Sequence, residues 1–201
     1  MILNLKGDNM PPKNKFTRNE IISCALGIAE EGGLEAVTAR AVASCLEASS
    51  KVIFGCFESM NELQNEVVAA AYQKYLDEQA RLCESGEYPV YKASGMAYIC
   101  FARSYPKLFK ILFMQISPPD EPGKLEEMNR FTDIVSKNVG IAKDDAYMFH
   151  LEMWVYVHGI ATMIATGYLN WEQETVSRML TDAYMGLKER YAKLYEPKGS
   201  E

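Results

Sequence analysis

The sequence predicts an all-α protein of about nine helices, three short ones in front and a larger bundle behind. Three observations favour this fold class. The alternating apolar and polar runs that are typical of strands are absent. Apolar residues recur instead at three- and four-residue spacing, the period of an amphipathic helix. Capping residues, glycines and prolines stand where each periodic stretch begins or ends.

The first helix is predicted after Thr17, because a threonine followed three residues later by Glu20 forms a capping box. An apolar stripe that begins at Ile21 and Ala25 follows, and the glycine pair at 32–33 ends the helix.

A second short helix is predicted after Thr38, and residues 47–49 make a tight turn into a third helix over roughly 50–56. Ser59 with Glu62 is a second capping box, which opens a long helix that runs to about residue 83.

Five more helices are predicted beyond the break at 85–89. A proline at position 106 suits the first turn of one of them, and residues 117–123 form a loop. The five are expected near 90–104, from 106, and near 124–138, 144–167 and 172–195.

The composition indicates a soluble cytoplasmic protein. The net charge is −6, no apolar run reaches the roughly 18 residues of a membrane span, and the N-terminal stretch lacks the features of a signal peptide. Five scattered cysteines predict reduced thiols, and two histidines make a structural metal site improbable. We therefore expect no metal, no cofactor and no membrane partner.

The second and third helices, joined by a tight turn, predict a helix-turn-helix, in which the third helix enters the major groove of DNA. A plain helical bundle is the alternative, because small helical hairpins are common. The residues argue for the first interpretation. The stretch Phe16–Leu63 resembles the DNA-binding domain of the tetracycline-repressor (TetR) family in its first helix ending in Gly-Gly, in "VTARAVA", in Ser49 and in Phe57.

Two later stretches, 102–115 and 154–167, resemble segments of the ligand domain in one branch of the same family. The resemblance implies a homodimeric, ligand-responsive transcriptional regulator, with no enzymatic step and no cofactor. Residues 1–14 are polar with a proline pair and are expected to form a disordered arm. A helix-turn-helix domain is expected over 15–60, and a ligand-binding and dimerisation domain over 61–201. The implied partners are a palindromic double-stranded DNA operator, a small-molecule effector and a second copy of the chain.

The sequence departs from the family pattern in the reading helix. Glu47 and Lys51 stand where glycine is usual, and Phe54, Cys56 and Met60 replace a tyrosine, a histidine and a lysine that commonly contact phosphates. Such contacts supply much of the affinity for DNA. Two hypotheses follow: other residues replace the lost donors, or the chain is a ligand-binding or interaction module that has lost DNA binding. On the first hypothesis, the DNA-contacting residues are Lys15, Arg18, Thr38, Arg40, Ser49, Ser50, Lys51 and Phe54.

Aromatic and imidazole side chains recur at helical spacing in the second half, as they do in pockets of helical bundles. They can equally be plain core. The expected ligand-binding set is Tyr98, Phe101, Tyr105, Tyr147, His150, Trp154 and His158.

The last helix carries a wide apolar stripe, which needs a partner if the helix lies at an edge. An intersubunit four-helix bundle would supply that partner. Inward packing within a monomer is the alternative. The expected dimer interface is Ile160, Met163, Ile164, Val176, Met179, Leu180, Ala183 and Tyr184. No nucleophile with a base and no phosphate loop is found, so we expect no enzyme.

Overall fold

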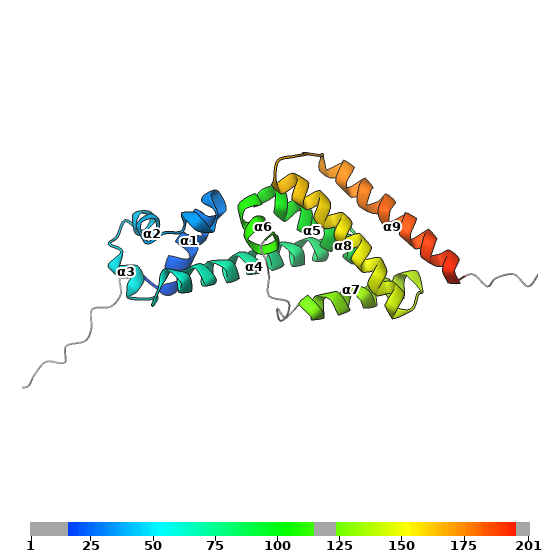
Figure 1. The fold of residues 1–201 in the computed structure, drawn as a ribbon, viewed down its shortest axis with the longest axis horizontal. Helices are drawn as coiled ribbons and strands as arrows, with labels where there is room; N and C mark the ends of the chain where they lie inside the picture. The colour runs from blue at the N-terminus through cyan, green and yellow to red at the C-terminus, as the bar shows by residue number, and fades with distance from the viewer. Residues whose placement is uncertain (1–15, 115–123, 196–201) are drawn as a thin grey trace, which may run out of the picture. The chain divides into compact units, whose positions relative to one another are not determined.

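The computed structural model describes residues 16–114 and 124–195 of the chain. Within these ranges the structure contains nine α-helices, one 3₁₀-helix and no strand, so the predicted all-α class is confirmed (Figure 1). The chain forms two compact units, one up to Val67 and one from Val68 onward. The expected arm, the whole of the expected loop at 117–123 and Lys15 lie outside the described residues.

The first unit is a three-helix head closed by the start of a long helix. Thr17 Oγ1 accepts from the Glu20 N–H at 3.3 Å, and the Glu20 carboxylate accepts from the Thr17 N–H at 2.7 Å. The predicted capping box is therefore confirmed, and Gly33 ends the helix with φ 82°. The elements are α1 (Arg18–Gly32), η1 (Leu34–Ala36), α2 (Ala39–Cys45), α3 (Lys51–Phe54) and α4 (Met60–Glu84), which continues into the second unit.

The second capping box forms only in part. The Ser59 hydroxyl accepts from the Glu62 N–H at 3.2 Å, as predicted. The Glu62 carboxylate, however, accepts from the Glu58 N–H at 2.6 Å, and its other oxygen pairs with Arg18 of α1. The third helix is also shorter than predicted, a single turn from Lys51 to Phe54.

The second unit packs around α8, which contacts four other helices of this unit. In Figure 1, α8 lies between α7 and α9. Gly95 of α5 allows close packing, since a Cβ there would lie 3.3 Å from Val157 of α8 and 3.5 Å from Leu180 of α9. Pro106 takes the predicted first-turn place in α6. The bounds are α5 (Val90–Ser104), α6 (Pro106–Phe113), α7 (Lys124–Val139), α8 (Lys143–Ala165) and α9 (Gln173–Tyr195).

The structure corrects the prediction that all cysteines are reduced thiols. Cys24 of α1 and Cys45 at the end of α2 form a disulfide, and their Cα atoms lie 6.4 Å apart. The two positions are 21 residues apart in sequence, so only the packing of α1 against α2 brings them together.

Glu47 has a backbone conformation that side chains rarely adopt. Its φ of 49° makes it the one non-glycine residue with positive φ among the described residues. The position lies in the turn between α2 and α3, where the resembling family usually has glycine. A Cβ in the left-handed region crowds the backbone, so this turn stores strain.

We predict that Glu47→Gly stabilises the first unit by about 1 kcal/mol, because relief of the left-handed strain exceeds the entropy that glycine adds to the unfolded chain. Denaturant unfolding measures the effect. Glu31→Gly, inside the regular helix α1, is the matched control and should cost about 1 kcal/mol. Equal losses in the two variants would contradict the assignment of strain to Glu47.

Candidate functional site

Two buried apolar side chains attach the candidate reading helix α3 to the core of the first unit. Ile53 is fully buried and Phe57 is 2% exposed, so this side of the turn belongs to the core of the first unit. The opposite side presents Lys51 and Phe54, the latter 52% exposed. The backbone turn that precedes α3 is closed by the Ala48 N–H, which donates to the Ala43 carbonyl at 2.9 Å.

Polar groups stand at the N-terminal ends of both α2 and α3. Thr38 caps α2, where its Oγ1 accepts from the Ala41 N–H at 3.2 Å, and Arg40 in the first turn is exposed. Ser49 and Ser50 precede α3 and are exposed as well. Helix N-termini carry unpaired N–H groups and a partial positive charge, so they suit phosphate oxygens.

The three positions that lack the family's donors differ in exposure. Phe54 is exposed but has no hydroxyl. Cys56 is half-buried, and its Sγ lies 3.8 Å from the Phe16 carbonyl oxygen. Met60 is half-buried at the start of α4. Of the three, only Phe54 presents a large exposed surface.

Arg18 occupies a different place from the one the sequence pattern suggested. One nitrogen of its guanidinium donates to the Cys56 carbonyl at 2.8 Å, and the other lies 2.7 Å from both Glu62 and Glu66. The same group lies 4.2 Å from the centre of the Phe57 ring. These contacts join α1 to the segment between α3 and α4 and to the first turns of α4. Sequence reasoning missed them because the partners are 38 to 48 residues away.

The Arg18 contacts also change the ionisation of a partner. The Glu58 N–H and the Arg18 guanidinium hold the pKa of the Glu62 carboxyl below its usual value. Glu62 therefore stays ionised at neutral pH and keeps the pair intact.

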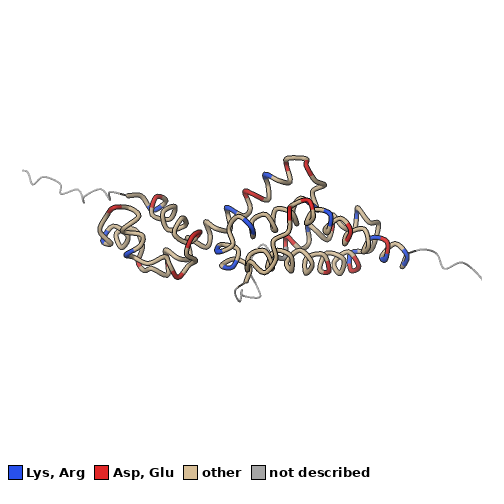
Figure 2. Tube along the Cα trace, turned by 90° about the horizontal axis from the view of Figure 1, so that it is seen from above, with Lys and Arg blue, Asp and Glu red and all other residues tan. Residues whose placement is uncertain are grey.

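The first unit is not a basic domain. Residues 16–67 contain three basic side chains, Arg18, Arg40 and Lys51, against eight acidic ones. Figure 2 shows both signs of charge along this unit and no continuous basic stretch. Since Arg18 is bound by two carboxylates, Arg40 and Lys51 are the cations left for an incoming anion within these residues.

In the second unit, three of the predicted ligand residues meet in one cluster. The Tyr98 hydroxyl lies 2.8 Å from His158 Nδ1, and the Trp154 ring stacks on His158 at 5.2 Å. Burial raises the pKa of Tyr98 and lowers that of His158, so the pair is neutral at pH 7. Trp154 is the accessible member, at 45% exposed.

Phe101 and Tyr105 extend this cluster along α5. Their rings lie 5.3 Å apart, and Phe101 packs edge-on against Tyr75 of α4 at 5.5 Å. Lys74 covers the other ring, with Nζ 4.0 Å from the centre of Tyr105. These rings fill the space between helices, so the aromatic set includes core residues as well as Trp154.

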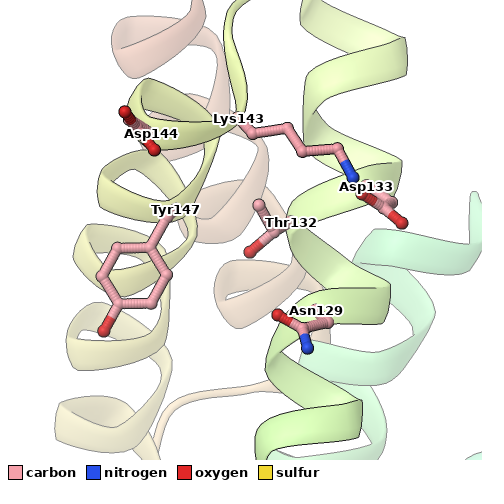
Figure 3. A pocket seen from close by; sticks show the side chains of 6 residues that line it. All are labelled: Asn129, Thr132, Asp133, Lys143, Asp144 and Tyr147. Carbon is pink, nitrogen blue, oxygen red and sulfur yellow. Dashed lines mark ion pairs between the residues drawn. The ribbon is translucent and has the colours of Figure 1, made fainter.

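The remaining two predicted ligand residues lie elsewhere. His150 bonds the Tyr91 hydroxyl at 2.9 Å, and burial lowers its pKa to about 4. Tyr147 is 44% exposed and lines a separate groove between α7 and α8, of about 510 Å³ (Figure 3). The groove is lined by Asn129, Thr132, Asp133, Lys143, Asp144 and Tyr147, and is called the α7–α8 groove below.

The predicted dimer stripe divides between two roles. Ile160, Val176 and Leu180 are at most 4% exposed, so they belong to the core of the second unit, where α9 packs on α5 and α8. Their part in a dimer interface stays a prediction. Met163 remains exposed, and the other four are half-exposed: Ile164, Met179, Ala183 and Tyr184.

Neither a membrane-spanning helix nor a metal-binding group is found in the described ranges, 16–114 and 124–195. No helix there is long and apolar enough to cross a membrane. No group of three or more histidine, cysteine or acidic side chains there could hold a metal ion.

In the described residues, a helix-turn-helix arrangement of α2 and α3 precedes a separate helical unit. Residues 91–184 match the family model described as "Tetracyclin repressor-like, C-terminal domain". The second unit is thus similar to the C-terminal domain of that family, and this match supports the resemblance found from the sequence. No curated protein matches the chain.

We predict that Arg18→Met loosens the head, because three hydrogen bonds to Cys56, Glu62 and Glu66 are lost while the apolar stem remains. Amide hydrogen exchange should become faster in α1 and in the first turns of α4. Arg81→Met removes one exposed pair with Glu78 and is the control. Protection that is unchanged in Arg18→Met would show that these contacts do not hold the head together.

Proposed function

We propose that this protein is a homodimeric transcriptional repressor that binds palindromic DNA through α3 and leaves it when a small molecule binds the second unit. The C-terminal domain family supports a regulator of this kind. The observation that carries DNA binding is the exposed Lys51 and Phe54 surface, presented by a turn whose inner side is fully packed. We assign residues 15–60 to DNA binding and 61–201 to the effector and the dimer, and expect the protein to act in the cytoplasm.

Within the head, substitutes take over from the missing phosphate donors. Thr38 and Ser49 stand at helix N-termini, and Lys51 is the cation of the reading helix. Lys15 belongs to the segment that precedes the described residues and would follow a groove, as short basic arms do elsewhere. Arg18 acts as a positioning residue, because its guanidinium already bonds two carboxylates.

The effector is proposed to bind beside the Tyr98, His158 and Trp154 cluster. Trp154 offers an exposed ring over a neutral, hydrogen-bonded pair. Apolar walls with few polar groups are typical of small-molecule sites. Phe101 and Tyr105 would form the floor of this site, and His150 a second neutral pair further along α8.

The dimer is proposed to form through an outer stripe of α8. Met148, Val155 and Met163 are 38–59% exposed and fall within one sector of the helix at its 3.6-residue period. Gly159 lies between them, and a Cβ there would meet nothing within 4 Å. A second copy can therefore approach closely at this glycine. Exposed Met185 of α9 adds to the apolar surface.

We predict that Val155→Glu weakens the dimer at least tenfold, because two like charges would meet across the two-fold axis without partners. Sedimentation velocity at micromolar concentration measures the change. Val90→Glu, at a similarly exposed position at the start of α5, should leave the dimer intact. Sedimentation of the wild type as a monomer would refute the interface.

We also predict that Lys51→Ala weakens operator binding by about 1–3 kcal/mol if the side chain reads a base, or lowers the salt slope by about one if it touches a phosphate. Lys137→Ala, on α7 of the second unit, should change neither. Adding donors with Phe54→Tyr and Met60→Lys should raise the affinity for all sequences equally, because phosphate contacts carry no base information.

The operator is found by selecting genomic fragments with purified protein at low salt. Recovery of a palindrome supports the proposal. Recovery of none, with no gain in affinity from the added donors, favours the second candidate function, a helical ligand-binding or interaction module without DNA binding. The observation that favours this candidate is the excess of acidic over basic side chains in residues 16–67.

A further inference from the structure

The α7–α8 groove lies apart from the aromatic cluster, and its lining is mostly polar. Its volume of about 510 Å³ falls within the roughly 300–1,000 Å³ typical of small-molecule sites. Two helices supply its walls, Asn129, Thr132 and Asp133 from α7 and the remaining residues from α8 and its first turn (Figure 3).

Thr132 indicates a ligand site because its hydroxyl has no hydrogen-bond partner among the described residues. The residue is 7% exposed, and Oγ1 makes no hydrogen bond with any part of the chain that the structure describes. The other two buried polar side chains, Gln79 and His150, each bond a tyrosine hydroxyl. Figure 3 shows the Thr132 hydroxyl between the two helices. A buried hydroxyl without a partner is unfavourable, so a hydrogen-bonding ligand would satisfy it.

The charged side chains that line the groove determine whether a cation or an anion would bind there. Lys143 Nζ lies 2.7 Å from Asp133 Oδ1, so these two neutralise each other. Asp144 is exposed and has no ion-pair partner among the described residues. The lining therefore carries a net charge of about −1, which attracts a cation and repels an anion.

Tyr147 and Asn129 complete the arrangement. Tyr147 follows Asp144 by three residues, so both lie on one face of α8, and an ammonium beside the carboxylate would also meet the exposed ring. Asn129 precedes Thr132 by three residues on α7 and adds an amide that both donates and accepts. The groove thus offers one cation position and two neighbouring positions for hydroxyl groups.

We propose that the α7–α8 groove binds a hydroxylated amine, with its ammonium at Asp144 and Tyr147 and a hydroxyl at Thr132 and Asn129. Binding at this site can be measured without DNA, because every residue that lines the groove belongs to the second unit.

The experiment is an NMR titration of the full chain at about pH 6 with three probes of similar ring size. Glucosamine carries an ammonium and hydroxyls, glucose only hydroxyls, and cyclohexylammonium only the charge. We expect shifts at Thr132, Asp144 and Tyr147, with glucosamine at least tenfold tighter than either single-function probe. Equal binding of the three, shifts elsewhere, or no binding would overturn the proposal.

Two variants test the roles of the side chains. Thr132→Val keeps the shape and removes the hydroxyl, so it should weaken glucosamine at least fivefold while the melting temperature stays equal or rises. Asp144→Asn should weaken both amines at least tenfold. Glu174→Gln removes an acid from the first turn of α9 and should change nothing. A lower melting temperature in Thr132→Val would show that the hydroxyl already has a structural partner, and so would contradict the site.

Discussion

The first unit, the three-helix head, depends on the contacts that the Arg18 guanidinium makes. A single-turn helix cannot hold itself in water, because helix nucleation is unfavourable and the turn gains few hydrogen bonds of its own. The position of α3 is fixed instead by Ile53 and Phe57 beneath it and by Arg18, which bonds the Cys56 carbonyl and the first turns of α4. The disulfide between α1 and α2 fixes the preceding segment in the same way.

This arrangement has a consequence for DNA binding. Two carboxylates already neutralise the Arg18 guanidinium, so Arg40 and Lys51 are the other cations of residues 16–67 that could meet a phosphate. Phosphate contacts dominate the affinity of most DNA-binding proteins. With Phe54 in place of a donor, recognition by this head would depend on helix N-termini, on Lys51 and on aromatic contact more than on charge.

Local signals in the sequence predicted the fold well. The Thr17 box, the Gly33 stop and Pro106 are decided within a few residues, so they can be read without tertiary information. The links from Arg18 to Glu62 and Glu66, and from Cys24 to Cys45, join residues 21 to 48 positions apart and could not. The stripe of α9 correctly indicated that the helix needs a partner, but periodicity cannot say which one. Val176 and Leu180 pack against the other helices of the second unit. Thr132 gave no signal, because a helical threonine usually bonds its own backbone.

We propose that this head binds DNA through few phosphate contacts. The most direct measurement is the dependence of operator affinity on salt concentration, with the selected palindrome and purified protein. Each phosphate contact contributes about −0.9 to the slope of log K against log salt. We expect saturable binding with a shallow slope, which becomes steeper by about one per subunit in the Phe54→Tyr, Met60→Lys variant, because only the added lysine neutralises a phosphate. A steep slope in the wild type, or no saturable binding at low salt, would contradict the proposal.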